Sequence, residues 1–462
     1  MASTYLTRTP SSTGNKQIFT FSAWVKRSLI TSDKFTLLGG YNGDSDTGYF
    51  DIRFLNLTDR LNLTGWNSNW LTTTRVFRDV NAWYHIVYAI DTTQATPSNR
   101  IKLYVNGIQE TAFDVNTEIN RNLNLPINTS GTAMIIGRSS YTPSPIKYFN
   151  GLMSHVHFID GTQYDASYFG ETDVTTGEWK IKTSPSVTYG TNGFFILKDG
   201  NSVTDQSGKG NNFTVGGGTL TKTEDSPSNV FCTMNPLISQ TAGVAGRNNP
   251  IDAKFFNGNT TIATSVAYWT PQLGNMEMFS GKYYWEQKFE VDGTPSNYLS
   301  WIGIEATDTA GTALGNPSGT NANGIAYGTG GVVNKSGSSQ SGSWSTWTAG
   351  DIVMCAVDLD NNYIYFGKNG TWQNSGVPTS GGSGTGGVAV TTGKSYITAS
   401  TIHRGGNYSI NTTYSYAKSN FGNGYFGTTA VSSAGTNASG NGIFEYDVPT
   451  GFTALSTKGL NL

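Results

Sequence analysis

Charged side chains are scarce in this sequence. Asp, Glu, Lys and Arg together make up 13% of the 462 residues, and the formal net charge is −2. Proteins that bind DNA or RNA gather Lys and Arg against the phosphates, so the composition argues against nucleic acid as a partner. No apolar run reaches the roughly 18 residues that a membrane-spanning helix needs, and the N-terminal residues lack the apolar core of a secretory signal.

Cysteine is almost absent as well, since the chain has only Cys232 and Cys355. Their wide separation excludes a zinc site built from cysteines, and we expect two free, buried thiols rather than a disulfide. The motifs of phosphate-binding loops, serine nucleophiles and zinc proteases are also missing. No cofactor is therefore predicted firmly. His155 and His157 share a strand face and could chelate a metal ion, but a half-buried strand face is the favoured interpretation, and calcium is the metal ion that the sequence favours most.

Aromatic residues are abundant at 13%, and there are 57 glycines. Aromatic residues favour half-buried strands, and glycines favour tight turns. Phe19–Val25 alternates with the period of two that is typical of a strand, and Asn106-Gly107 is a strong hairpin signal. Similar short runs recur at Trp83–Ile90, Ile101–Val105, Leu152–Ile159, Lys282–Val291, Tyr298–Glu305, Asp351–Leu359 and Tyr363–Lys368. The predicted fold class is all-β, with two antiparallel β-sandwiches joined by a β-rich connector.

Two families share these strand patterns. Residues 1–170 resemble the laminin-G-like members of the concanavalin-A-like sandwiches, in the pieces Phe19–Arg27, Trp83–Ile90, Arg100–Gly107 and Gly151–Phe158. Residues 281–426 resemble a SPRY domain, in the pieces Gly281–Glu286, Trp301–Ile304, Gly350–Leu359, Ile364–Gly370 and Asn420–Phe426. These resemblances imply a laminin-G-like sandwich at 1–170, a β-rich connector packed on it at 171–236, and a SPRY-like sandwich at 237–462. Within the last, 306–345 and 380–387 are expected to be long loops.

The pairing of the two domains, together with the opening segment Ser3–Arg27, resembles proteins encoded by marine bacteriophages. That resemblance implies an external virion protein, either a tail fibre or a capsid appendage. It would contact other virion proteins and a host cell-surface glycan without catalysis, and it would form a homo-oligomer, most simply a trimer if it is a tail fibre. Two alternatives stay open, a purely structural capsid knob or cement protein and a polysaccharide depolymerase.

A depolymerase would need paired carboxyl groups. Glu445 and Asp447 are two residues apart and would share one face of a strand, but no third acid follows them. Glu286, Glu290 and Asp292 also share a face, but Lys288 lies between them, which is more typical of a solvated edge. We therefore predict no catalytic residues.

Two polar loops could supply oxygen ligands for calcium. The first contains Asp44 and Asp46, and the second contains Asp199, Asn201 and Asp205. Asp, Asn and Gly also build ordinary turns, so turn formation is the alternative interpretation of both loops.

Two tryptophan-rich segments are candidates for glycan binding. Lectin sites combine an exposed aromatic ring with amides and carboxylates. The segment GWNSNW supplies Trp66, Asn67, Asn69 and Trp70, and SWSTW supplies Trp344 and Trp347. In polar surroundings exposed aromatic residues mark ligand sites or interfaces. The alternative is that these tryptophans pack beneath their own loops or in a subunit contact.

Overall fold

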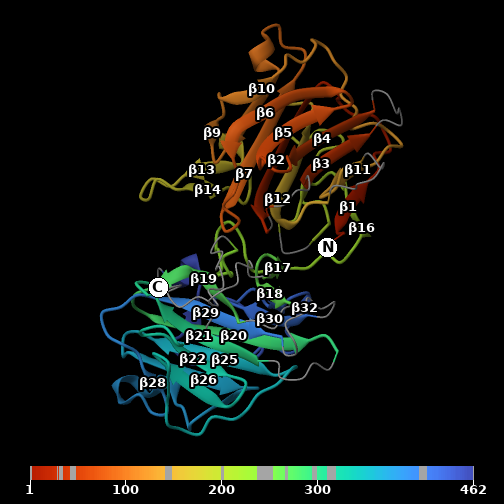
Figure 1. The fold of residues 1–462 in the computed structure, drawn as a ribbon. Helices are drawn as coiled ribbons and strands as arrows, with labels where there is room; N and C mark the ends of the chain where they lie inside the picture. Colours follow the sequence, from red (N-terminus) through yellow and green to blue (C-terminus); the bar gives the residue numbers. More distant parts are fainter. Residues whose placement is uncertain are drawn as a thin grey trace, which may run out of the picture. The chain divides into compact units, whose positions relative to one another are not determined.

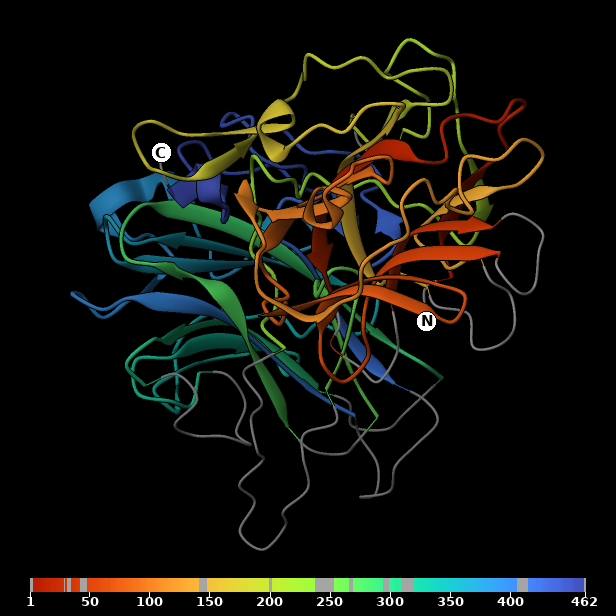
Figure 2. The ribbon, with the colours of Figure 1, turned by 90° about the horizontal axis from the view of Figure 1, so that it is seen from above.

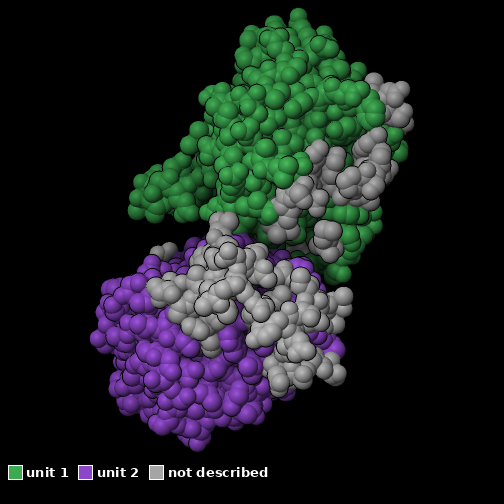
Figure 3. Space-filling model, in the orientation of Figure 1, with its two compact units in different colours: residues 1–222 green, residues 223–462 purple. Residues whose placement is uncertain are grey.

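The computed structural model describes residues 3–28, 30, 35–41, 48–140, 148–198, 202–236, 253–265, 269–293, 299–309, 319–404 and 414–460. The chain divides into two compact units, Met1–Lys222 and Thr223–Leu462 (Figure 3). The predicted connector, residues 171–236, is shared between them. Its first part lies in unit 1, whereas Phe231, Cys232 and Met234 belong to the core of unit 2.

Unit 1 contains two large antiparallel sheets (Figures 1 and 2). The eight-stranded sheet has the order β10 (Phe113–Asn116), β6 (Ser68–Val76), β5 (Arg60–Gly65), β4 (Tyr49–Phe54), β3 (Phe35–Tyr41), β11 (Met134–Ile136), β1 (Tyr5–Arg8) and β16 (Thr214–Gly217). The six-stranded sheet has the order β15 (Phe194–Ile196), β12 (Gly151–Asp160), β2 (Ile18–Arg27), β7 (Trp83–Asp91), β8 (Ile101–Val105) and β9 (Ile108–Gln109).

Alternation along the strands builds the core between these sheets. Phe19 and Phe21 of β2 lie in one buried cluster with Phe50 and Ile52 of β4. Because successive side chains of a strand point to opposite faces, the residues between them lie on the outer faces. Burial of this shared apolar face stabilises the sandwich.

The outer face of the six-stranded sheet carries a second, smaller core. Val87, Ile159 and Phe195 point away from the main core and pack with Phe169 and Tyr189. The segment that covers them includes the 3-10 turn η2 (Ala166–Tyr168) and the hairpin of β13 (Gly170–Thr172) and β14 (Trp179–Ile181). Asp165 caps η2 by accepting a hydrogen bond from the Ser167 amide at 2.8 Å. A further 3-10 turn, η1 (Pro97–Asn99), precedes β8.

Unit 2 is also a two-sheet sandwich. Its nine-stranded sheet has the path β17 (Lys254–Phe256), β18 (Thr261–Thr264), β30 (Ser415–Asn420), β20 (Lys282–Val291), β25 (Ile352–Asp358), β26 (Tyr363–Lys368) and β27 (Thr371–Trp372), with β28 (Val388–Ala389) on β26 and β33 (Thr453–Ala454) on β20. Its six-stranded sheet has the order β19 (Thr270–Met278), β29 (Tyr396–His403), β21 (Leu299–Ala306), β22 (Ile325–Gly328), β23 (Val332–Lys335) and β24 (Ser338–Ser339). A short ribbon of β31 (Tyr425–Phe426) and β32 (Thr429–Ala430), the 3-10 segment η3 (Pro378–Ser383) and the helix α1 (Thr457–Leu460) complete the described elements.

The predicted all-β fold class is confirmed, and both cysteines are buried and form no disulfide, as expected. The predicted long loop at 306–345 is wrong in part, because β22, β23 and β24 lie within it and extend the six-stranded sheet. Among the described residues no helix is long and apolar enough to cross a membrane.

Candidate functional site

The tip of the β5–β6 hairpin carries the first predicted glycan segment. Gly65 and Ser68 pair across the hairpin, so Trp66 and Asn67 form a two-residue turn. Asn67 has a φ of 47°, a left-handed conformation that Asn adopts more readily than most residues. The turn holds the half-buried Trp66 ring beside the exposed Asn67 side chain.

Two tyrosines that the sequence did not indicate extend the aromatic surface from Trp66 across the neighbouring strands. The Tyr49 and Trp66 ring centroids are 6.5 Å apart in an edge-to-face arrangement. Tyr41 of β3 pairs directly with Tyr49 of β4, and all three residues are half-buried. Aromatic rings in such positions offer an apolar surface with a polar edge. We call Tyr41, Tyr49, Trp66, Asn67 and Asn69 the hairpin platform.

Asn69 is exposed, and hydrogen bonds fix its side chain. Its Oδ1 accepts from Asn62 Nδ2 at 2.6 Å and from Thr72 Oγ1 at 3.2 Å. Asn62 Oδ1 in turn accepts from Arg53 Nε at 3.0 Å. With Oδ1 occupied, the Asn69 amide nitrogen makes no hydrogen bond within the described part of the chain. Asn69 therefore presents an oriented donor to solvent.

The network continues beneath the surface to a buried charge pair. Arg53 Nη1 lies 3.8 Å from Asp51 Oδ2, which accepts from Ser139 Oγ at 2.7 Å. Asp51 is fully buried, and Arg53 is 7% exposed. The signal for this network was available in the sequence YFDIRF, because its two charged residues alternate with apolar ones.

The prediction of an exposed, glycan-binding ring is wrong for Trp70. It is 8% exposed and lies in the main core of unit 1 rather than on an exposed platform. A Cβ on Gly65 would lie 2.5 Å from the Trp70 ring, so the glycine makes room for it. Trp70 therefore supports the hairpin from below.

The second predicted segment is also more buried than expected. Trp347 is 3% exposed, and its ring lies 6.0 Å from those of Phe289 and Tyr327. Trp344 is half-buried, 6.0 Å from Tyr327 and 6.3 Å from Phe366. The expectation of an exposed ring is wrong for Trp347, because strands within 306–345 bring SWSTW back onto the core.

Asp205 does not fit the predicted calcium site. Its Oδ1 accepts from the Phe195 and Ser207 amides at 2.8 and 2.9 Å, and its Oδ2 accepts from Ser207 Oγ and the Asn211 amide at 2.7 and 2.8 Å. These four donors occupy the lone pairs of the carboxylate, so Asp205 organises its own turn.

The other predicted calcium ligands, Asp44, Asp46, Asp199 and Asn201, lie outside the described residues. Within those residues no group of three His, Cys, Asp or Glu side chains is placed to hold a metal ion.

The buried His85 is locked in one tautomer. Trp179 Nε1 donates to His85 Nδ1 at 3.0 Å, and because indole can only donate, Nδ1 carries no proton. The proton on Nε2 therefore points at Ser22 Oγ, 2.9 Å away. Burial lowers the pKa of His85 to about 3, so the ring stays neutral and cannot take a proton from Ser22.

Glu286, expected on a solvated edge, is fully buried. Its carboxyl group accepts from the Tyr284 hydroxyl at 2.8 Å and from the Glu445 and Tyr446 amides at 2.9 Å each, with Asn420 at 3.4 Å. Burial raises the pKa of Glu286 to about 7, although these hydrogen bonds act in the opposite direction. The prediction for Glu286 was wrong, because this strand lies inside the sheet and the C-terminal segment covers it.

Comparison with known families matches two parts of the chain. Residues 2–167 match the concanavalin A-like lectin/glucanases superfamily, and residues 282–392 match the SPRY domain. No curated protein sequence matches the chain.

Several solved structures are similar to parts of the chain at low sequence identity. The human HERC1 SPRY domain has 16% identity and a TM-score of 0.29, with 40% of this chain and 96% of that chain covered. A heptameric SAP-like pentraxin from Limulus polyphemus has 14% identity and a TM-score of 0.26, with 35% and 72% covered. Domain 4 of an extracellular arabinanase from Geobacillus stearothermophilus has 16% identity and a TM-score of 0.25, with 32% and 64% covered. At these identities the likeness concerns the fold alone. The chain thus contains two β-sandwiches, of which the first matches the concanavalin A-like lectin/glucanases superfamily over residues 2–167 and the second matches the SPRY domain over residues 282–392.

Proposed function

We propose that the first sandwich binds a glycan at the hairpin platform and does not cleave it. The observation that carries this proposal is the row of half-buried aromatic rings beside a hydrogen-bonded amide. The rings offer apolar faces to sugar C–H groups, and the Asn69 amide offers a donor to a sugar hydroxyl. Because Asn62 and Thr72 already hold Asn69, little side-chain freedom is lost on binding.

The chemical groups around the platform favour glycan binding without catalysis. Glycoside hydrolysis uses two carboxyl groups, about 5–9.5 Å apart, that flank the scissile bond. In the described part of the hydrogen-bonded network below the platform, Asp51 is the one carboxylate, and it is buried against Ser139 and Arg53. In this environment the Asp51 carboxylate has a structural role.

We further propose that the protein acts on the external surface of a bacteriophage virion, as part of a tail fibre or capsid appendage. The resemblance of Ser3–Arg27 and of the domain pairing to marine phage proteins supports this location. Its partners would be other virion proteins and a glycan of the host cell surface. An electron-microscopy map of the encoding phage should contain the chain on the outside, and purified virions that lack it would refute the location.

The binding proposal is tested with the full chain on an array of bacterial surface oligosaccharides. Trp66→Ala and Asn69→Ala should each weaken binding about tenfold or more, which corresponds to about 1.4 kcal/mol. Tyr168→Ala is the matched control, because Tyr168 is an exposed aromatic residue of the same unit, 41% accessible, outside the platform. Unchanged binding by Trp66→Ala would refute the platform, and release of shortened sugar chains would refute the absence of catalysis.

A further inference from the structure

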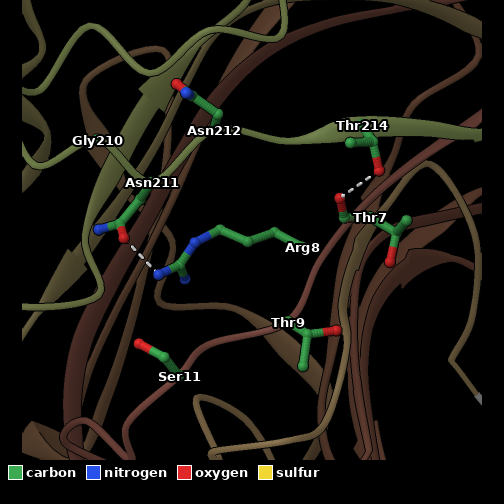
Figure 4. Close-up of a pocket in the computed structure, with 8 residues that line it drawn as sticks. All are labelled: Thr7, Arg8, Thr9, Ser11, Gly210, Asn211, Asn212 and Thr214. Atoms are coloured by element: carbon green, nitrogen blue, oxygen red, sulfur yellow. Dashed lines mark hydrogen bonds between the residues drawn. The ribbon is translucent and has the colours of Figure 1, made fainter.

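Unit 1 has a polar pocket that lies apart from the hairpin platform. Its volume is about 400 Å³, within the usual range for small-molecule sites. It is lined by Thr7, Arg8, Thr9, Ser11, Gly210, Asn211, Asn212 and Thr214 (Figure 4). The pocket is formed by β1, by β16 and by the chain segments that adjoin these two strands. In the eight-stranded sheet β1 is four strand spacings from β5, or roughly 19 Å at about 4.8 Å each.

Arg8 is held in place at this pocket. Its Nη2 donates to the side-chain oxygens of Asn211 and, at 3.4 Å, of Asn192. Asn211 Nδ2 donates to the carbonyls of Thr191 and Gly193 at 2.9 and 2.7 Å, which fixes the acceptor for Arg8. The guanidinium is therefore positioned before any ligand arrives.

The other end of the guanidinium has an unused donor. Arg8 Nη1 is buried and has no hydrogen-bond partner among the described residues. A buried donor left without a partner costs about 1–3 kcal/mol. A ligand oxygen that reached Nη1 would supply that missing hydrogen bond.

The charge around Arg8 argues against an anionic ligand. Burial lowers the pKa of Arg8, while the nearby Asp205 and Asp160 carboxylates raise it. Asp160 is itself occupied, since it accepts from the Asn15 amide, Asn128 Nδ2 and the Asn192 amide at 2.7, 2.8 and 3.0 Å. One guanidinium and two carboxylates give a local charge of −1, so the pocket has no surplus positive charge to attract a phosphate or a carboxylate.

We propose that this pocket binds a neutral saccharide unit, as a second glycan site of unit 1. The proposal rests on glycan binding as the function of this sandwich. Thr9, Ser11 and Thr214 carry hydroxyl groups, which can donate and accept hydrogen bonds, and Asn212 adds an amide. This lining matches the alternating donors and acceptors of sugar hydroxyls, and Arg8 adds a charged donor without a net positive field.

The test fills the pocket and leaves Arg8 in place. Thr9 is exposed and makes no side-chain hydrogen bond among the described residues, so Thr9→Trp should block the pocket without unfolding the chain. Thr111→Trp is the matched control, an exposed threonine of the same unit outside the pocket. If Thr9→Trp lowers the melting temperature, Ser11→Trp, also exposed at the rim, replaces it.

The probes are an array of neutral oligosaccharides of glucose, galactose, mannose and N-acetylglucosamine, and a matched array of glucuronic and galacturonic acid oligomers. Thr9→Trp should weaken the binding of at least one neutral saccharide about tenfold. Thr111→Trp should bind the same saccharide as tightly as the wild type does. Pocket-dependent binding of the acidic oligomers alone, or equal binding by all three proteins, would overturn the proposal.

The same arrays separate the two glycan sites. If binding is lost with Trp66→Ala but not with Thr9→Trp, the platform is supported as a glycan site and the pocket is refuted. If binding is lost with Thr9→Trp but not with Trp66→Ala, the pocket is supported and the platform is refuted. A wild-type chain that binds no saccharide on either array would refute both.

Discussion

Trp347 packs between Phe289 and Tyr327 in the core of unit 2, with 3% of its surface exposed. Replacing a large buried aromatic residue with Ala leaves a cavity and costs about 3–5 kcal/mol. For a domain of this size, Trp347→Ala should lower the melting temperature by roughly 6–20 °C. Trp66→Ala, at a half-buried turn, should change it little. Calorimetry of the two variants checks this, and similar melting curves would show that Trp347 is not part of the core.

Glu305 gives unit 2 a pH-dependent stability. Its Oε1 accepts from the Gly319 amide at 2.7 Å, and burial raises its pKa from 4.5 to about 7. The folded chain thus holds this proton more tightly than the unfolded chain. Stability should therefore fall as the pH rises from about 4.5 to about 7 and stay level above that, with a total loss of up to about 3 kcal/mol.

Glu305→Gln removes this titration while keeping a similar shape. Its free energy of unfolding, measured in urea between pH 5 and pH 8, should vary less with pH than that of the wild type. A residual slope is expected, because the pKa of Glu286 is raised in the same direction. Glu277→Gln changes an exposed carboxylate and should keep the full slope. An unchanged slope in Glu305→Gln would contradict the assignment.

The site could be predicted only in part at the level of single residues. GWNSNW indicated an aromatic turn with amides, and the structure places Trp66, Asn67 and Asn69 there. Trp70 was misjudged because the polar composition of the segment does not show that Trp70 points inward, to the face opposite that of its neighbour Asn69. Tyr41 and Tyr49 were missed because their relation to Trp66 depends on the pairing of β3, β4 and β5.

At the level of elements, Trp179 fastens the β13–β14 hairpin to the six-stranded sheet. A Cβ on Gly107 or Gly170 would lie 2.4 or 2.5 Å from its ring, so both glycines make room for it. Trp179→Ala would also leave the buried His85 without its donor, at a cost of about 1–3 kcal/mol for that hydrogen bond alone. The hairpin should then open more often, and trypsin should cut faster after Lys180 and Lys182.

Val174→Ala is the control for this prediction, because Val174 is fully exposed in the same hairpin and touches no core. It should be digested at the wild-type rate. Equal digestion of Trp179→Ala and wild type would mean that the hairpin is held by something other than Trp179.

The elements that the sequence predicted best have a strong strand pattern. β8, β20 and β26 have the predicted bounds, Ile101–Val105, Lys282–Val291 and Tyr363–Lys368. The missed strands β22 and β23 have four residues each and lie in a Gly-, Ser- and Asn-rich stretch. They form because β21 offers a free sheet edge to β22, and β22 in turn pairs with β23. Such pairing depends on distant residues, so local composition does not reveal it.

At the level of the whole molecule, each unit has its own core. The large cluster of unit 1 contains residues of both its sheets, and the cluster of unit 2 is equally self-contained. The predicted connector is divided for the same reason, since β16 pairs with β1 while Phe231 enters the second core. A boundary set by composition alone could not show which core each strand completes.

The composition and the exposed apolar side chains favour self-assembly of the chain. Charged residues make up only 13% of the chain, which leaves little of the like-charge repulsion that keeps proteins apart. Large apolar side chains are also exposed, such as Phe279 at 72% and Ile108 at 67%. Burial of such side chains between identical chains would stabilise an oligomer, and homo-oligomers usually have closed point-group symmetry. We therefore expect a homo-oligomer in light scattering at micromolar concentration, most simply a trimer if the chain is part of a tail fibre. Phe279→Ser should shift the mass toward the monomer, whereas a wild-type chain that is monomeric under these conditions would refute self-assembly.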